Sequence, residues 1–345
     1  MSTPASFGLG SVEVEICNSL MPILDIEPSK IREGFGALYE LQKKHISKSH
    51  QFKLPKELGM DGSGQVEQMA VHFFYPDGYE KNPSGHQYPV IFYIHGGGFM
   101  VDGIKKLPRE ISNRTNSILV YPDYGLTPEV KYPNGLKQCY QLFTGIMDKT
   151  YNPFNDLNVD QGITIVGESS GGNYALALPL MLKLNKSPFF SKITKVLAYY
   201  PITDSNFETP SYNRFGENFY LTKEGMKWCW NHYTNTDSDR NDITCCPNKA
   251  TVDQVKDFPT TMIMTAETDV LSSEGEQFGE KLSKANVNTF VVRMLKTIHG
   301  FVSLDQTDHT VACRVGMDVS MNFLNNISNE TIFNENNNKT LLRLV

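Results

Sequence analysis

The stretch GITIVGESSGG, residues 162–172, decides the fold that we expect for this chain. Residues 162–166, which are rich in β-branched side chains, predict a buried strand, and residues 172–184 predict an apolar helix. A strand that turns directly into a helix at Gly-x-Ser-x-Gly leaves room only for glycine at Gly167 and Gly171, and it exposes the hydroxyl between them. We therefore predict that Ser169 is a nucleophile held above a sheet.

A second glycine motif, HGGGF at residues 95–99, follows the apolar run at residues 88–94. Glycines in such a loop let backbone N–H groups approach a reacting carbonyl and hold its developing negative charge. Together with the turn at Ser169, the motif predicts an oxyanion hole made by the N–H groups of Gly97, Gly98 and Ser170. We expect His95 to brace this loop by hydrogen bonding.

A serine nucleophile needs a base, and the base needs an acid that fixes its tautomer. Downstream of Ser169, the predicted strand 260–265 runs into Glu267 and Asp269, and the predicted strand 290–295 runs into His299. In parallel sheets of this kind, functional residues lie at the carboxyl ends of the strands. We therefore predict His299 as the base, with Asp269 or Glu267 as the acid.

The remaining histidines and acids fit structural roles better. His309 is the only rival base, but it falls in a predicted helix at 309–325. We expect Glu168, beside the nucleophile, to point away from it and anchor the turn, and we expect Glu129 to be a hydrogen-bond partner. Five histidines are expected on surface or cap segments: His45, His50, His72, His86 and His232.

Three segments outside the glycine motifs carry a family resemblance. DYGLTPE at 123–129 is similar to the D-Y-R-L-A-P-E segment of the hormone-sensitive-lipase branch of the α/β-hydrolases, a group of carboxylesterases and lipases. YYPI at 199–202 resembles that family's strand ending in Tyr-Pro, and residues 221–233 resemble its cap helix. The resemblance runs from about residue 90 to residue 301.

The resemblance implies which carboxylate is the acid, and the chain also departs from the family pattern at three positions. Asp269 stands in the family's D-x-L position, which favours it over Glu267. The chain departs from the family pattern at Glu168, Ser170 and Gly125, where the family has Asp, Ala and Arg. These departures bear on substrate preference rather than on the chemistry.

Alternating strand-like and helical segments predict an α/β-hydrolase fold, with a mostly parallel central sheet, helices on both faces and a mainly helical cap. We expect residues 1–50 to form the N-terminal part of the cap and residues 51–203 the first part of the core. Residues 204–247 are the predicted cap insertion, and residues 248–345 complete the core. A helix is predicted within residues 28–49, where lying on a membrane surface is the alternative to packing in the cap.

Composition excludes several other classes of function. The net charge of −6 and the absence of Lys/Arg-rich runs argue against a nucleic-acid partner. No 18-residue apolar window predicts a transmembrane segment, and the N-terminus lacks a signal-peptide pattern, so we expect a cytoplasmic protein. The six cysteines show no framework spacing, and we find no metal or cofactor motif. The sequence leaves the oligomeric state open, a homodimer included.

The function that these observations favour is hydrolysis of short- to medium-chain carboxylic esters through an acyl-enzyme on Ser169. Hydrolysis of amides is an alternative, because it uses the same triad. A ligand-binding receptor of the same fold is a second alternative, since relatives such as the gibberellin receptors lost the catalytic histidine. The presence of His299 argues against a receptor function.

Overall fold

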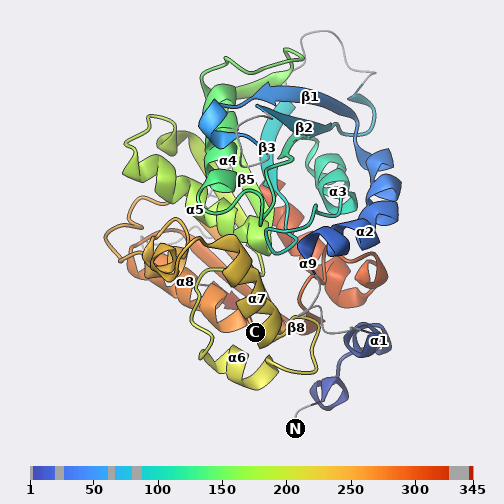
Figure 1. Cartoon of the computed structure of the whole chain (residues 1–345). Helices are drawn as coiled ribbons and strands as arrows, with labels where there is room; N and C mark the ends of the chain where they lie inside the picture. The colour runs from blue at the N-terminus through green and yellow to red at the C-terminus, as the bar shows by residue number, and fades with distance from the viewer. Residues whose placement is uncertain (1–2, 20–26, 61–66, 80–87, 326–341, 345) are drawn as a thin grey trace.

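The computed structural model describes residues 3–19, 27–60, 67–79, 88–325 and 342–344 (Figure 1). Within these residues the strands form one nine-stranded sheet in the order β1-β2-β4-β3-β5-β6-β7-β8-β9. The strands are β1 (Lys48–Lys53), β2 (Gln68–Phe74), β3 (Tyr88–Ile94), β4 (Ile118–Pro122), β5 (Leu157–Glu168), β6 (Ile193–Tyr199), β7 (Thr260–Thr268), β8 (Thr289–Ile298) and β9 (Leu342–Leu344). The α-helices are α1 (Ser11–Ser19), α2 (Pro28–Gln42), α3 (Lys106–Thr115), α4 (Asn134–Met147), α5 (Ser170–Leu184), α6 (Pro210–Phe215), α7 (Lys223–Tyr233), α8 (Ser272–Lys284) and α9 (Val311–Asn325).

The sheet is mostly parallel, as predicted. Only β2 runs antiparallel to its neighbours β1 and β4, and every pairing from β4 to β9 is parallel. Parallel pairing of consecutive strands requires crossover connections, which the helices between them supply. The α/β-hydrolase fold predicted from the sequence is confirmed.

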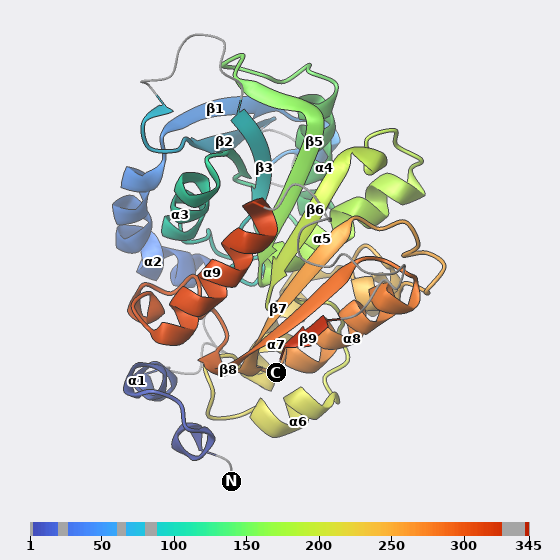
Figure 2. The same ribbon diagram turned by 180° about the vertical axis from the view of Figure 1, so that it is seen from behind.

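Helices cover both faces of the sheet, and each face has its own apolar core (Figures 1 and 2). Val90 and Phe92 of β3 pack on the side of α4, α5 and α8, whereas Ile91 and Tyr93 pack on the side of α3 and α9. Successive side chains of a strand point to opposite faces, so a strand that is apolar throughout is buried on both. This explains why the central strands read as continuous apolar runs.

Several elements differ from the sequence predictions, since α1, α6 and β9 were not predicted and β1 and α3 differ as well. The helix predicted within residues 28–49 ends at Gln42, and residues 48–53 form β1, an edge strand that spans the predicted boundary at residue 50. Its side chains are largely exposed, so backbone pairing with β2 stabilises it rather than an apolar pattern. Helix α3 was not predicted, because Leu107 and Ile111 are its main apolar anchors in an otherwise polar sequence.

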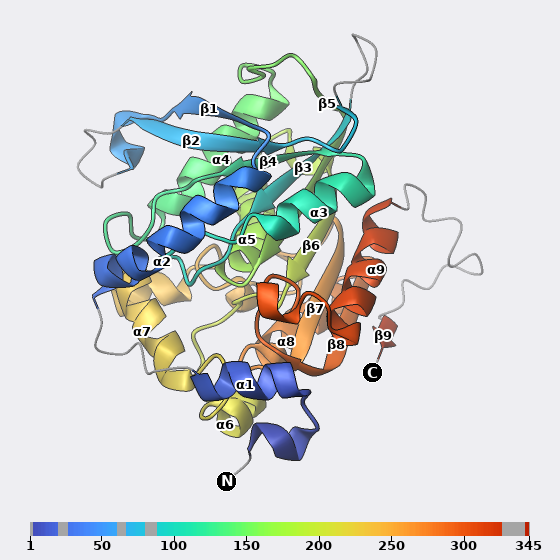
Figure 3. The ribbon, with the colours of Figure 1, turned by 90° about the vertical axis from the view of Figure 1, so that its right-hand side faces the viewer.

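Helices α1, α6 and α7 of the predicted cap lie beyond the end of the sheet where β7 and β8 finish, and α1 lies beside α6 there (Figure 3). Helix α2, which also belongs to the predicted cap, lies alongside α3 instead (Figures 1 and 3). Phe7, just before α1, packs edge-on against Phe215 and Phe219 with ring centroids 5.2 and 5.7 Å apart. Thr222 caps α7, because its side chain accepts the Gly225 N–H at 3.0 Å. The boundaries proposed for the cap remain predictions.

None of the helices in the described residues is both long and apolar enough to cross a membrane. The asparagine-rich composition of residues 334–338 predicts a disordered tail, and these residues lie outside the part of the chain that the structure describes. All six cysteines are free thiols, including the neighbours Cys245 and Cys246.

Candidate active site

The turn between β5 and α5 has the tight geometry predicted for it. Ser169 adopts a left-handed φ of 56°, a conformation that non-glycine residues take only under local constraint. A Cβ on Gly171 would overlap the carbonyl oxygens of Ile94 and His95, and a Cβ on Gly167 would overlap the Gly171 carbonyl. The close approach of three backbone segments therefore requires both glycines, which confirms the prediction for this turn.

Ser169, His299 and Asp269 lie in one hydrogen-bonded line. The Nε2 atom of His299 is 2.9 Å from Ser169 Oγ, and its Nδ1 is 2.8 Å from Asp269 Oδ2. Asp269 Oδ1 also accepts the Leu271 N–H at 3.0 Å, which fixes the carboxylate. Because a carboxylate only accepts, the proton of neutral His299 lies on Nδ1, and Nε2 is free to accept the serine proton. The three side chains are buried, with exposed fractions of 8% or less.

The rival residues lie elsewhere. The Glu267 carboxylate accepts the Lys296 N–H at 2.7 Å, at a partly exposed position on β7. His309 is exposed in the turn before α9. The structure thus brings Asp269 rather than Glu267 to His299, while the catalytic roles themselves stay predictions.

The loop after β3 presents unpaired N–H groups beside this line. In the described part of the chain, the N–H groups of Gly97, Gly98 and Ser170 donate no hydrogen bond. The neighbouring Gly96 N–H, in contrast, donates to Glu168 Oε1 at 2.5 Å. Buried backbone donors are nearly always paired, so a group of free donors is suited to an oxyanion that forms during a reaction.

Glu168 anchors the turn, as predicted, and contacts the oxyanion loop rather than the nucleophile. Its side chain is fully enclosed, and desolvation by burial raises its pKa from 4.5 to about 7. The Gly96 N–H and the nearby His299 act in the opposite direction and favour the carboxylate. Glu168 is thus a buried acid whose charge affects the oxyanion loop and the histidine together.

His95 braces the loop, as predicted. Its Nδ1 donates to the Gly96 carbonyl at 2.7 Å, and its ring is stacked between Tyr121 and Tyr124 at centroid distances of 5.1 and 4.2 Å. Tyr124 in turn donates from its hydroxyl to the His95 carbonyl at 2.8 Å. Stacking on Tyr121 and Tyr124 and the hydrogen bond to the Gly96 carbonyl therefore fix the orientation of the His95 ring.

Helix α2 supports the same loop from outside. Arg32 donates to the carbonyl oxygens of Met100 and Thr127 at 3.2 and 3.0 Å and to Glu129 Oε1 at 2.5 Å. Glu129 is therefore a structural partner, as predicted. The guanidinium joins the end of the oxyanion loop to the DYGLTPE segment.

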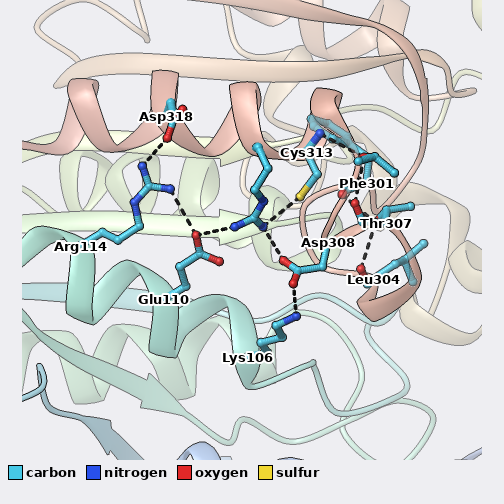
Figure 4. Close-up of polar contacts among 11 residues, drawn as sticks. Lys106, Glu110, Arg114, Phe301, Leu304, Thr307, Asp308, Cys313 and Asp318 are labelled. Carbon is cyan, nitrogen blue, oxygen red and sulfur yellow. Dashed lines mark hydrogen bonds and ion pairs between the residues drawn. The ribbon is translucent and has the colours of Figure 1, made fainter.

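The loop that follows His299 is tied to two helices (Figure 4). Lys106 of α3 and Arg314 of α9 both form ion pairs with Asp308. Inside the loop, the Thr307 hydroxyl donates to the Phe301 carbonyl at 2.8 Å. Partly exposed ion pairs contribute little one by one, but here they connect three chain segments. The connection limits the movement of the loop that carries His299.

Tyr220, just before α7, lies beside His299. Its ring is nearly parallel to that of His299, at an interplanar angle of 17° and a centroid distance of 6.4 Å. Trp230, Phe215 and Phe219 are buried packing residues. Sequence reasoning missed Cys229, whose Sγ would lie 3.1 Å from a Cβ on Gly98. No sequence signal marks this contact, because the two residues are far apart in the chain.

Comparison with known proteins agrees with this geometry. A family model described as the alpha/beta hydrolase fold matches residues 91–303. The vegetative-specific protein H5 of Dictyostelium discoideum is 74% identical over 342 residues, covering 99% of each chain. An esterase of Fusarium pseudograminearum is 28% identical over 237 residues, 67% of this chain and 71% of the relative. The solved structure of a thermostable esterase from Pseudomonas putida has a TM-score of 0.80 and 25% identity, covering 92% of this chain and 97% of that one.

The tight turn at Ser169, the glycine loop and the mostly parallel sheet are those of an α/β-hydrolase. The chain belongs to the α/β-hydrolase family, in the branch that resembles hormone-sensitive lipase.

Proposed function

We propose that the chain is a serine carboxylesterase that acts on small, soluble esters. The observation that supports this most strongly is the line from Ser169 Oγ through His299 to Asp269, with hydrogen bonds of 2.9 and 2.8 Å. The chain is also similar to proteins that are themselves named esterases.

In the first half of the proposed reaction, Ser169 Oγ attacks the ester carbonyl carbon while His299 Nε2 takes the hydroxyl proton. The carbonyl π electrons move to oxygen, and the N–H groups of Gly97, Gly98 and Ser170 donate to that oxyanion. Each such donor contributes about 3 kcal/mol of transition-state stabilisation. The imidazolium then protonates the leaving alcohol as the C–O bond breaks, which leaves an acyl group on Ser169.

In the second half, a water molecule attacks the acyl carbon while Nε2 again takes a proton. The tetrahedral intermediate collapses, the proton passes to Ser169 Oγ, and the carboxylic acid leaves. Asp269 stays ionised throughout and stabilises the imidazolium that forms in both halves.

An amide hydrolase would use the same residues, and a receptor of this fold would not need them. A panel of aryl esters from acetyl to dodecanoyl, assayed beside an aryl acetamide, separates these functions. The carboxylesterase proposal expects kcat/KM for the esters to exceed that for the amide. A higher kcat/KM for the amide than for the esters would make the chain an amidase. No turnover of esters or amides, with binding of these compounds retained, would make it a receptor.

A further inference from the structure

A second cluster of polar side chains includes His95, at the start of the oxyanion loop, residues 95–102. His95, Asp102 and Asp123 each place one potential ligand atom within 4.8 Å of the others. His95 follows β3, Asp102 lies at the far end of the oxyanion loop, and Asp123 follows β4. Three separate segments therefore converge on one point.

The His95 ring directs an unpaired lone pair at this point. Its Nδ1 faces the Gly96 carbonyl, which can only accept, so Nδ1 carries the proton of the neutral ring and Nε2 carries the lone pair. Nε2 is fully buried and has no hydrogen-bond partner. The nearest carboxylate atom, Asp102 Oδ1, is 4.0 Å away and cannot donate when it is ionised. The lone pair therefore faces other lone pairs.

The two carboxylates are unequally compensated. Asp102 accepts from the Tyr121 hydroxyl at 2.9 Å and is ion-paired with Lys105. Among the described residues, no hydrogen bond reaches the Asp123 carboxylate, and the nearest ring nitrogen, His72 Nε2, is 3.9 Å away. The Asp123 carboxyl group is therefore left without a close hydrogen-bond partner.

The nearby lysines are engaged with other groups. Lys43 pairs with Glu40 at 2.6 Å, and the Lys48 ammonium lies over the Tyr75 ring at 4.7 Å. A recess of about 470 Å³, lined in part by His72, Asp102 and Asp123, leads to the cluster. The side chains of Asp102 and Asp123 keep exposed fractions of 21% and 37%. A small solute can therefore reach both carboxylates from outside.

We propose that His95 Nε2, Asp102 and Asp123 bind a divalent transition-metal cation. Imidazole and carboxylate together suit Zn²⁺, Mn²⁺ and related ions. Ligand atoms about 2.0–2.2 Å from a metal lie roughly 3–4 Å apart, so ligand atoms up to 4.8 Å apart need to approach one another by about 1–2 Å. The ion would join both ends of the oxyanion loop to the end of β4, and its role is to hold that loop.

The direct test uses the unmodified full-length chain, stripped with EDTA and titrated with Mn²⁺ while free Mn²⁺ is followed by electron paramagnetic resonance. We expect one saturable Mn²⁺ per chain, displaced by Zn²⁺ at lower concentration. Pulsed resonance should detect nitrogen coupling from an imidazole ligand. Thermal unfolding should show a higher Tm with the cation than after EDTA.

Matched variants identify the ligands. Asp123→Asn should weaken Mn²⁺ binding by at least about tenfold. Asp160→Asn, which changes an exposed carboxylate paired with Lys149, should leave binding unaltered. The same titration in Ser169→Ala keeps the result independent of the proposed hydrolase activity.

Three results would overturn the proposal: no saturable binding, saturable binding without nitrogen coupling, or binding that Asp123→Asn does not weaken. The first would mean that a water molecule satisfies His95 Nε2. Because the nitrogen coupling is measured on the unmodified chain, a variant that folds poorly does not decide the outcome.

Discussion

His299 and His95 follow two separate strands of the same sheet, β8 and β3, and carry the proton on the same ring nitrogen. Their Nε2 atoms nevertheless face different kinds of group. His299 Nδ1 is held by a carboxylate, and its Nε2 faces the Ser169 hydroxyl at 2.9 Å. His95 Nδ1 is held by a backbone carbonyl, and its Nε2 faces two carboxylates, the nearer contact being 4.0 Å.

The difference shows how the partner of Nε2 sets the chemistry of an imidazole. Facing a hydroxyl, the lone pair can take a proton and act as a general base. Facing carboxylates, it has no proton to take and is suited to a positive ligand. The oxyanion loop contributes residues to both sites, since Gly97 and Gly98 present free N–H groups and His95 and Asp102 belong to the second cluster.

The largest expected effect tests the hydroxyl that His299 faces. Ser169→Ala should lower kcat on an aryl ester by about a million-fold, because the nucleophile is removed while the fold is unaffected. Turnover and far-UV circular dichroism of the purified variant check this. Retention of more than a few per cent of activity would show that another residue is the nucleophile.

The next effect tests the carboxylate behind His299. Asp269→Asn should lower kcat by roughly four orders of magnitude, since the amide favours the wrong tautomer of the histidine. The matched change Glu267→Gln, on an acid that accepts only the Lys296 N–H, should cost far less. If the two variants rank the other way, the acid is Glu267.

A smaller effect tests the buried acid beneath the oxyanion loop. The pKa of Glu168 is about 7 in the folded chain against an ordinary 4.5, so the folded state binds the proton more tightly. This contribution to stability is fully present below pH 4.5 and is lost as the pH rises to 7. It corresponds to about 3 kcal/mol of unfolding free energy.

Glu168→Gln should remove that dependence, so the variant gains stability relative to the unmodified chain as the pH rises from 4.5 to 8. Urea unfolding at several pH values measures the difference, with Glu267→Gln as the control. Parallel stability curves for Glu168→Gln and the unmodified chain would mean that Glu168 is not a perturbed acid.

The smallest effects concern what covers each site. The predicted cap lies over His299, with Tyr220 beside it, whereas a recess leads to the second cluster. We expect each methylene of a short acyl chain to stabilise the transition state by up to about 1 kcal/mol, which raises kcat/KM. Once the pocket is filled, kcat/KM should fall with each further methylene. A series of aryl esters from acetyl to dodecanoyl measures this. A maximum at dodecanoyl, or a jump in rate on emulsion formation, would indicate a lipase.

Much of the site could be predicted because its determinants are local. The turn at Ser169 depends on glycines two residues away on either side, where any Cβ would overlap a carbonyl. The order of Ser169, Asp269 and His299 could be predicted because each follows an apolar strand, and parallel strands end at one edge of the sheet. The central strands could be predicted from the sequence because burial on both faces makes them apolar throughout.

Other features depend on tertiary contacts that leave no local pattern. Strand β1 is stabilised by backbone pairing, and α3 by ion pairs with α9 and its preceding loop, so neither needs an apolar repeat. Glu168 meets the Gly96 N–H across 72 positions of the chain.

The two histidines mark the division most clearly. The sequence by itself determined that His299 follows a strand and that His95 precedes a glycine loop. Only the folded chain decided what each Nε2 faces, because Ser169 lies 130 residues from His299 and Asp102 and Asp123 reach His95 from two further segments. The physical reason is that a lone pair takes its role from neighbours in space, and those neighbours come together only when the sheet has formed.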